Sequence, residues 1–200
     1  MTDTILSNRE GGILTLTFHR LDKKNAITRA MYTAMAEALE AAAADDTVRV
    51  AVIQGDPTCF TAGNDLMDFL SNPPDMTPGA EPAPVVRFLD ILRDFPKPLI
   101  AAVAGPAVGI GTTLLLHCDL VYVSRDAQLK MPFVNLGLCP EYGSSLILPR
   151  LLGHARAAAR SRAGADGGQT CARAGGGCAC GCPAGTHEKP GHGTPGALCR

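Results

Sequence analysis

Short apolar runs alternate along the first three quarters of the chain with stretches that repeat apolar residues every three or four positions. Residues 13–18 (ILTLTF) alternate apolar with polar side chains, and 48–53, 99–103 and 120–123 are nearly continuous apolar runs. Both patterns predict strands. Because continuous apolar strands are covered on both faces, we expect largely parallel pairing.

Helices are predicted between these strands. Thr28 has the side chain of a helix N-cap, and the stretch after it carries Met31 and Met35 on one face. Pro96 and Pro98 end a second stretch with helical periodicity. Strands that alternate with helices predict an α/β fold. The predicted helices cover residues 28–44, 85–95, 112–118 and 141–152, and a short helix is expected after the loop at 60–65.

Residues 155–200 differ in composition from the rest of the chain. They contain no Ile, Val, Phe, Tyr, Met or Trp and only one Leu, but 5 of the 8 Cys and 11 of the 22 Gly. Such a segment buries too little apolar surface to offset its chain entropy. We therefore expect a core at 1–156 and a disordered Gly/Ala/Cys-rich tail at 157–200. Because GC-rich codons encode these residues, we hypothesise an out-of-frame reading from about Ala157, which sequencing of the coding DNA would test.

Charge and hydropathy narrow the range of partners. The chain has 200 residues and a formal net charge of -1, so nothing favours a nucleic acid or a membrane surface as partner. No apolar run approaches the roughly 20 residues of a membrane-spanning helix. The N-terminus lacks the basic start and apolar run of a signal peptide. We expect a cytoplasmic protein.

Two Gly-containing loops, 62–66 (AGNDL) and 109–111 (GIG), each lie between a predicted strand and a predicted helix. Backbone N–H groups at the start of a helix have no intrahelical acceptor, and two of them aimed at one point form an oxyanion hole. Taken alone, each loop is better explained as a tight turn that needs glycine at positive φ.

Glu141 follows Pro140 at an apparent helix start. An acidic residue is common there, because it interacts favourably with the helix dipole. The neighbours of Glu141 are mostly apolar or small, however, and such surroundings raise the pKa of a carboxyl group. Taken alone, the residue is better explained as an ordinary helix-start acid than as a proton-transfer group.

Three blocks decide between these interpretations: FHRLDKKNAIT (18–28), CFTAGNDL (59–66) and PKPLIAAVAGPAVGIGTTLLLHCDLVYVSRDA (96–127). In order and separation they resemble the crotonase (enoyl-CoA hydratase/isomerase) superfamily, over about residues 5–157. Together with MPFVNLGLCPEYGSS (131–145), AGNDL looks most like the peroxisomal-type Δ3,Δ2-enoyl-CoA isomerases. The resemblance implies the crotonase-like spiral of ββα units, a role in fatty acid β-oxidation, and an acyl-CoA thioester as substrate with no separate cofactor.

The resemblance also implies roles for individual residues. In the family, two backbone N–H groups bind the thioester oxygen, and their counterparts here are Asn64 and Ile110. The loop with Lys24 and Ala26 is similar to one that meets the CoA adenine and phosphates, and Ala62 to a residue whose backbone contacts CoA. The further substrate-binding residues implied are Asn64 again, Gly63, Asp65, Leu66 and Gly109.

For the reaction itself, Glu141 occupies the position of the glutamate that isomerase-type relatives carry after the LGxxPE proline. The two hydratase carboxylates would align with Thr113 and Phe133, neither of which can transfer the required proton. One carboxylate is enough to move a double bond. The resemblance therefore implies that Glu141 takes a proton from C2 of a 3-enoyl-CoA and returns it to C4.

Other functions stay open. The chain could catalyse a different reaction of the superfamily, such as hydration, thioester hydrolysis or dehalogenation, or bind an acyl-CoA without turnover. Relatives continue with a mainly helical part that closes the acyl pocket and supports trimers or hexamers. Because the resemblance ends near Ala157, we expect that helical part to be missing, apolar surface to be exposed, and assembly and activity to need testing.

A metal or thiol module in the tail is the remaining alternative. Its cysteines have CxC spacing at 178–182 and lack the CxxC spacing of structural zinc sites, so no metal site is expected. Cys59, Cys118 and Cys139 are most simply core or near-core thiols. The tail residues concerned are Cys171, Cys178, Cys180, Cys182, Cys199, His187 and His192.

Overall fold

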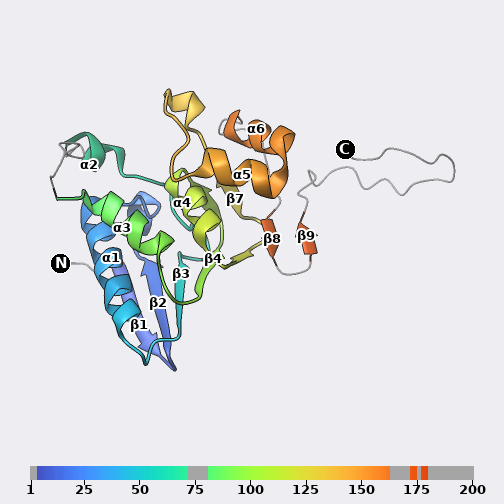
Figure 1. The fold of residues 1–200 in the computed structure, drawn as a ribbon. Helices are drawn as coiled ribbons and strands as arrows, with labels where there is room; N and C mark the ends of the chain where they lie inside the picture. Colours follow the sequence, from blue (N-terminus) through green and yellow to red (C-terminus); the bar gives the residue numbers. More distant parts are fainter. Residues whose placement is uncertain (1–3, 72–80, 163–171, 175–176, 180–200) are drawn as a thin grey trace.

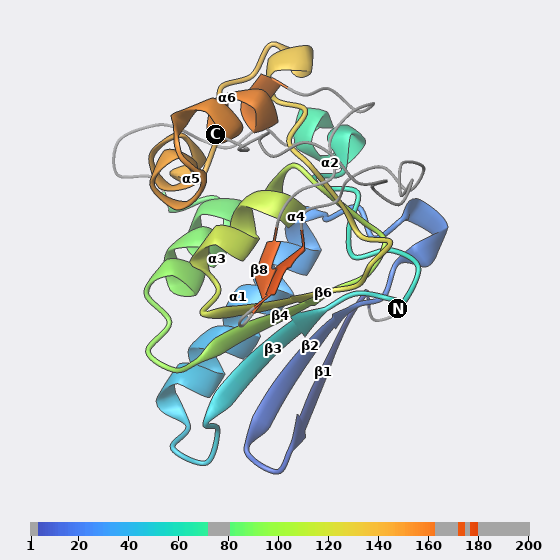
Figure 2. The same ribbon diagram turned by 90° about the vertical axis from the view of Figure 1, so that its right-hand side faces the viewer.

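The computed structural model describes residues 4–71, 81–162, 172–174 and 177–179 of the chain. Its centre is a five-stranded sheet with the order β1-β2-β3-β4-β6 (Figure 2). β1 pairs with β2 in antiparallel fashion, and every other neighbouring pair is parallel, as predicted. The strands are β1 (Ile5–Glu10), β2 (Ile13–Phe18), β3 (Val50–Gln54), β4 (Leu99–Val103) and β6 (Leu120–Val123).

Two helices, α1 (Arg29–Ala44) and α3 (Pro84–Arg93), cover one face of this sheet (Figure 1). The predicted cap of α1 is confirmed, because the Thr28 hydroxyl oxygen accepts a hydrogen bond of 3.4 Å from the Met31 N–H. The main core lies between helices and sheet and includes Phe18, Met31, Met35, Leu39 and Phe88. Alternate residues of β3 and β4 are only partly buried, so their apolar runs have one fully buried face rather than two.

A second, smaller layer follows β4. β5 (Pro106–Val108) pairs in parallel with β7 (Gln128–Lys130). Instead of the single helix predicted at 112–118, the chain forms α4 (Ile110–Thr113) followed directly by the 3-10 helix η2 (Leu114–His117). The helix starts earlier because Gly109, with φ 58° and ψ -117°, turns the chain in a conformation that L side chains rarely adopt.

The last helices form a separate layer over α4 (Figure 1). η3 (Val134–Leu136), α5 (Ser144–Leu152) and α6 (His154–Arg162) surround a small apolar cluster distinct from the main core. The helix predicted from residue 141 begins at Ser144, because Tyr142 and Gly143 both have positive φ and cannot continue a helix. The buried residues of this small cluster are Met131, Phe133, Leu148 and Ala157.

The expected boundary between core and tail, at 156/157, falls within α6. Beyond it, β8 (Ala172–Ala174) and β9 (Gly177–Ala179) form a two-stranded antiparallel pair. The rest of the expected tail, including most of its cysteines and both histidines, lies outside the described residues. Its disorder, its out-of-frame origin and its metal-binding alternative stay predictions.

The strands β1, β5 and β7 were not predicted, and the start of β3 differs from the prediction. β1 was not predicted, because five of its six residues are exposed and it carries no alternating apolar pattern. The strand expected at 48–53 is displaced to Val50–Gln54, since Val48 closes a turn by donating to the Asp45 carbonyl at 3.0 Å.

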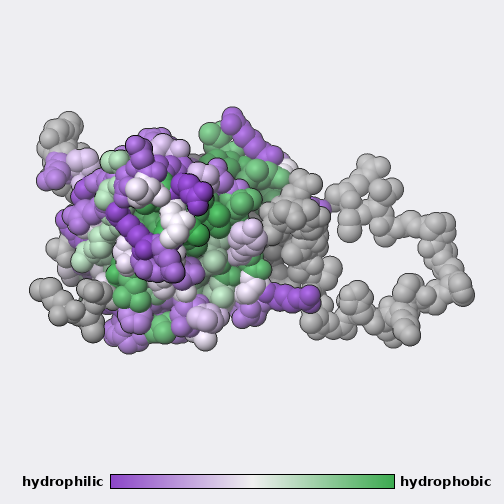
Figure 3. All heavy atoms as spheres, turned by 90° about the horizontal axis from the view of Figure 1, so that it is seen from below, coloured by the Kyte–Doolittle hydropathy of each residue, from purple (hydrophilic) through white to green (hydrophobic). Residues whose placement is uncertain are grey.

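The surface mixes polar residues with apolar ones. On the face in Figure 3, hydrophilic residues dominate and hydrophobic residues gather toward one side. No helix of the described ranges is long and apolar enough to cross a membrane. Exposed large apolar side chains occur on α2 (Leu66–Ser71), η3, α5 and the edge strand β6, and include Leu66, Met67, Phe69, Leu70, Leu120, Tyr122, Val134, Leu136, Leu146 and Leu151.

Candidate active site

A buried asparagine holds the first of the two predicted substrate loops. Asn25 is 0% exposed and adopts φ 54°, a left-handed conformation that Asn tolerates better than most residues. Its Nδ2 donates to the carbonyls of Cys59 and Phe60 at 2.9 and 3.2 Å, and its Oδ1 accepts from the Arg20 N–H at 2.8 Å. The Thr61 hydroxyl donates to the Asn25 carbonyl at 2.6 Å. The loop at 24–27 is thereby fixed against the segment at 59–63.

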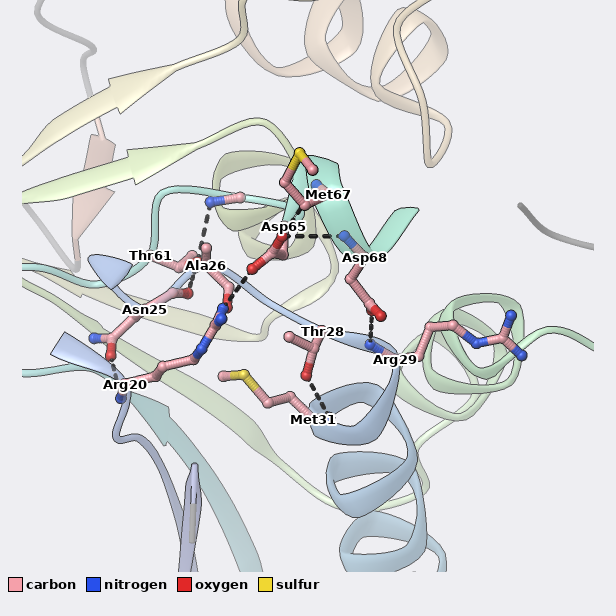
Figure 4. A network of polar contacts seen from close by, with 11 residues as sticks. Arg20, Asn25, Ala26, Thr28, Arg29, Met31, Thr61, Asp65, Met67 and Asp68 are labelled. Atoms are coloured by element: carbon pink, nitrogen blue, oxygen red, sulfur yellow. Dashed lines mark hydrogen bonds and ion pairs between the residues drawn. The ribbon is translucent and has the colours of Figure 1, made fainter. Parts of the chain in front are cut away.

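An ion pair spans the same two segments (Figure 4). Arg20 Nη1 donates to Asp65 Oδ2 at 2.7 Å and to the Ala26 carbonyl at 2.8 Å. Asp65 Oδ1 accepts from the N–H groups of Met67 and Asp68 at 3.1 and 3.2 Å, at the start of α2. Together these contacts hold the pKa of the Asp65 carboxyl below its usual range, with the Arg20 hydrogen bond as the largest cause. These protein groups engage the Asp65 carboxylate, and the predicted role of Asp65 in binding substrate stays a prediction.

The backbone around Asn64 leaves its N–H group pointing away from the loop at 24–27. The Gly63 carbonyl accepts from the Ile27 N–H at 2.8 Å. Because the C=O and N–H of a trans peptide point in opposite directions, the Asn64 N–H points to the other side. No acceptor for this N–H occurs among the described residues. Gly63 has φ 92°, and a Cβ there would lie 2.8 Å from the Val108 oxygen, so glycine is required at this approach.

Ile110 supplies a second N–H group in the same situation. The preceding Gly109 carbonyl accepts from the N–H groups of Thr112 and Thr113 within α4, so the Ile110 N–H points out of the first turn of the helix. The described part of the chain offers this N–H no acceptor. The Ile110 side chain is 1% exposed and packs in the main core, so the core accommodates an isoleucine at this position.

Thr61 joins the two loops. Its carbonyl accepts from the Val108 N–H at 3.0 Å, and its own N–H donates to the Pro106 carbonyl at 3.0 Å, as in a short parallel bridge. A Cβ at Gly111 would lie 2.3 Å from Thr61 Cγ2, so the second glycine of the turn is needed for this contact. The structure therefore brings together the two Gly-containing loops that the sequence singled out.

Glu141 lies in the loop between η3 and α5 and is half-buried. Its Oε1 is inaccessible to solvent and has no hydrogen-bond partner among the described residues. Buried polar atoms are nearly always hydrogen-bonded, so an unpartnered carboxylate oxygen is unusual. Burial raises the pKa of the Glu141 carboxyl above its usual range. A carboxylate in such surroundings is suited to take up a proton.

Tyr142 anchors this loop to the core. Its hydroxyl donates to the Leu89 carbonyl of α3 at 2.6 Å. Its ring stacks on His117 with a centroid separation of 3.7 Å, and the Tyr142 carbonyl lies 2.9 Å from His117 Nε2. The Glu141 carbonyl accepts hydrogen bonds from the Ser144 hydroxyl and N–H at 2.7 and 3.0 Å. The backbone of Glu141 is thus fixed on both sides.

Tyr32 contacts Asn64 and is close enough to Glu141 to be affected by its charge. The Tyr32 hydroxyl donates to Asn64 Oδ1. Burial, and next the negative charge of Glu141, raise the pKa of Tyr32 far above its usual range, so it remains a neutral donor. Tyr32 and Asn64 also line a small cavity of about 20 Å³, whose walls come from the end of the 24–29 segment and from α2 and α3. The other lining residues are Ile27, Arg29, Asp65, Asp68, Phe69, Ala83, Pro84 and Val85.

The remaining predicted residues take the following places. Lys24 is exposed, and its carbonyl accepts from the Ala62 N–H at 2.9 Å, so the loops of these two residues are directly paired. Ala26 is half-buried beside the Arg20 contact, and Leu66 is 60% exposed at the start of α2. The two hydratase positions carry no acid: Thr113 and Phe133 are both buried, and Phe133 belongs to the small apolar cluster.

Three thiols occur in the described core. Cys59 is buried, with Sγ 3.3 Å from the Lys24 carbonyl, and burial raises its pKa. Burial raises the pKa of Cys118 to about 12. Cys139 is exposed, two residues before Glu141, so the expectation of a core thiol fails there. Over the described ranges no three His, Cys, Asp or Glu side chains group as metal ligands would.

Sequence reasoning missed Arg20, Asn25, Tyr32 and Tyr142. Arg20 and Asn25 lie within a block that had been recognised, but their partners are about 35 to 45 residues away along the chain. Tyr32 was hidden within the apolar face of a helix. Tyr142 adjoins Glu141, and only its positive φ and its contact with α3 reveal its role.

Comparison with known proteins agrees with this geometry. The family described as "Enoyl-CoA hydratase/isomerase" matches residues 8–167. Enoyl-CoA delta isomerase 2 of Rattus norvegicus is 46% identical over 156 residues, which are 77% of this chain and 40% of that protein. 1,2-Epoxyphenylacetyl-CoA isomerase of Escherichia coli (strain K12) is 40% identical over 163 residues, covering 78% of this chain and 61% of that protein.

Among solved structures, OdaA of Pseudomonas aeruginosa is 64% identical with a TM-score of 0.75, and the match covers 80% of this chain and 63% of that one. The chain thus spans between 40% and 63% of the length of these relatives. The family match, the fold and the paired loops lead to one conclusion: the chain belongs to the enoyl-CoA hydratase/isomerase family of enzymes, the crotonase superfamily.

Proposed function

We propose that the chain carries the catalytic centre of an enoyl-CoA isomerase that moves a double bond from C3 to C2 of an acyl-CoA. The single observation that carries the proposal is the buried, unpartnered Oε1 of Glu141 together with its raised pKa. A group that is costly to the fold and that no structural contact explains is best accounted for by a role in proton transfer.

In the proposed reaction Glu141, as the carboxylate, removes a proton from C2 of a 3-enoyl-CoA. The electron pair of that C–H bond forms the C1–C2 double bond of a dienolate, and the charge falls on the thioester oxygen. The protonated Glu141 then returns the proton to C4 as the double bond forms between C2 and C3. No atom is gained or lost, so an isomerisation needs no water and no second carboxylate.

The N–H groups of Asn64 and Ile110 are proposed to bind the thioester oxygen. Both lack an acceptor in the described chain, and Thr61 holds their loops together. Each such donor contributes about 3–4 kcal/mol to stabilising the negative charge in comparable sites. The exposed Lys24 is proposed to meet a phosphate of CoA as a point charge.

Hydration is the reaction that the site supports less. A hydratase must activate a water and also protonate a carbon, and the positions expected to carry its carboxylates are Thr113 and Phe133. Thr113 is 0% exposed and its hydroxyl lies 3.4 Å from the Ile110 carbonyl, whereas Phe133 packs in the small cluster with Leu148.

The test is turnover of trans-3-hexenoyl-CoA to the 2-enoyl form by the purified chain and by Glu141→Gln. We expect the substitution to lower kcat by about 10³-fold or more while the affinity for hexanoyl-CoA is retained. Glu10→Gln, the same chemical change at an exposed position of β1, is the matched control and should keep full turnover. Retained isomerisation by Glu141→Gln would rule out the mechanism, and binding without turnover by the parent chain would favour an acyl-CoA binder.

A further inference from the structure

Arg20 joins two segments of the site through one nitrogen atom. Its Nη1 lies 2.8 Å from the Ala26 carbonyl and 2.7 Å from Asp65 Oδ2 (Figure 4). The Arg20 and Asp65 side chains are only 20% and 16% exposed, so water screens the pair less than it screens a surface ion pair. Removing one partner therefore leaves a partly buried charge without its counter-charge.

The Asp65 carboxylate is fixed in orientation by three donors. Oδ2 accepts from Arg20, and Oδ1 accepts from the N–H groups of Met67 and Asp68. Its backbone is fixed as well, because the Asp65 N–H donates to the Ile27 carbonyl at 2.9 Å. Rotation of the peptide that precedes Asp65 is thus restrained from both the side chain and the main chain.

The atoms held by Arg20 lie next to the atoms that the proposed function uses. Asp65 directly follows Asn64, whose N–H is proposed to bind the thioester oxygen. Ala26 lies in the loop of Lys24, which is proposed to meet the CoA phosphates. The guanidinium of Arg20 therefore bonds both to Ala26 and to Asp65, and Asp65 in turn bonds to Ile27, the residue after Ala26.

We infer that Arg20 and Asp65 are a positioning pair that aims the Asn64 N–H at the thioester oxygen and couples this aim to the CoA-binding loop. The inference rests on the proposed function, since it requires that the Asn64 N–H binds that oxygen. Neither side chain touches the reacting atoms, and each acts through the backbone of a neighbour.

The test is the infrared stretch of the carbonyl of bound hexanoyl-CoA labelled with ¹³C at C1, an ester that cannot isomerise. Hydrogen bonds to the oxygen lower this frequency, so we expect a shift to lower frequency in the parent chain. Arg20→Met should lose a large part of the shift and lower kcat on trans-3-hexenoyl-CoA about tenfold, with KM changed much less. Asp65→Asn, which keeps an oxygen to cap α2, should do the same, and the double variant should lose little more, as expected for one coupled pair.

Arg9→Met is the matched control, because Arg9 pairs with Asp45 at 3.1 Å in an exposed ion pair away from the site. It should keep both the carbonyl shift and kcat. If Arg20→Met does not fold, Asp65→Asn carries the same expectation, since it removes the charge of the pair with less change of shape.

A full carbonyl shift in Arg20→Met or Asp65→Asn overturns the inference. Loss of shift that Arg9→Met shares also overturns it, because the effect would then reflect general loosening. The proposed function fails separately: a parent chain that shifts the carbonyl but does not isomerise the 3-enoyl ester overturns the isomerase while leaving the pair supported. A parent chain that binds the ester without any shift overturns both.

Discussion

The two sides of the site are fixed by different means. On the side of Asn64, the loops at 24–27 and 59–65 exchange a dense set of backbone and side-chain hydrogen bonds, and Phe60 places them on the main core. On the side of Glu141, the chain carries two left-handed residues, Tyr142 and Gly143, and the next helix, α5, packs on a small separate cluster. The groups that would stabilise charge belong to the core, and the carboxylate belongs to a second layer.

This difference has a physical reason. N–H donors are effective when they are aimed before the reaction, and aiming them requires a backbone that cannot relax. Oε1 of Glu141 has no hydrogen-bond partner among the described residues, so the position of this oxygen depends on the groups that pack around it. We therefore expect changes in the main core to reduce stability first and changes in the second layer to reduce turnover first.

Phe60→Ala should have the largest effect on stability. Phe60 is 0% exposed and meets Phe18 edge to face at a centroid distance of 5.3 Å. Loss of a buried phenyl ring typically costs about 3–5 kcal/mol of the free energy of unfolding. Denaturant titration measures this loss. Phe69→Ala on α2, where the ring is 43% exposed, is the control and should cost far less; equal losses would break the comparison.

Leu148→Ala should separate the two layers. Leu148 is 6% exposed in the small cluster, and its truncation should cost about 2–3 kcal/mol at most. Because the cluster is separate from the main core, amide hydrogen exchange should speed up in residues 134–157 and remain slow in β2, β3 and β4. Turnover should fall as Glu141 loses its support.

The exposed Leu151 of the same helix supplies the control, since Leu151→Ala should change stability by less than about 0.5 kcal/mol. Faster exchange throughout the sheet in Leu148→Ala would show that the two layers unfold as one unit.

Tyr142→Phe should have a smaller effect that is specific to the carboxylate side. The change removes the hydrogen bond of 2.6 Å to the Leu89 carbonyl but keeps the ring on His117. A net loss of about 1 kcal/mol is expected, with kcat reduced several-fold and KM nearly unchanged. Tyr122→Phe, at an exposed position of β6, should change neither quantity. An unchanged kcat in Tyr142→Phe would mean that the hydroxyl does not position Glu141.

The smallest expected effect is a dependence of stability on pH that Glu141 introduces. Burial raises its pKa in the folded protein, so the folded state holds this proton more tightly than the unfolded state. Stability contributed by the protonated form is complete below the unfolded-state pKa and is lost as pH rises through the folded-state pKa. Glu141→Gln should therefore be more stable than the parent chain at about pH 8 and nearly equal at about pH 4.

Protonation of Glu141 should also reduce kcat at low pH. Because the base works as the carboxylate, kcat should rise with pH, with a midpoint above the ordinary carboxyl pKa of 4.5. Denaturant titrations and pH–rate profiles on the same samples measure the two effects. A parent chain that gains stability relative to Glu141→Gln with rising pH would have the wrong sign for a buried, unpartnered carboxylate.

Local sequence patterns were sufficient for elements whose burial follows a simple period. β2, β4, β6 and the capped helix α1 are where the pattern of apolar residues predicts them. β1 escaped because an edge strand with exposed side chains leaves no apolar signal. The start of α5 was misplaced because positive φ at Tyr142 is set by its contact with α3, which no local pattern encodes.

The site was predictable to a similar extent. The loops at 62–66 and 109–111 were found from glycines, because close backbone approach requires them. The contacts that hold these loops in place were not predictable, because they depend on hydrogen bonds from Thr61, Asn25 and Arg20 to partners far along the chain. The contacts of the Asp65 carboxylate with Arg20 and with the start of α2 were not predictable either, and the predicted role of Asp65 in binding substrate stays a prediction.

The cysteines of the described core allow opening of the contact between the loops at 24–27 and 59–65 to be followed by thiol labelling. Cys139 is exposed and should be alkylated by iodoacetamide in the folded protein, whereas Cys59 is enclosed between Lys24 and Pro106 and can react only when that contact opens. The rate of labelling at Cys59, followed by peptide mass mapping, therefore counts openings of the loop pair. A bound acyl-CoA that spans both loops should slow the labelling of Cys59 by a factor of about 1 + L/Kd, where L is the concentration of free acyl-CoA.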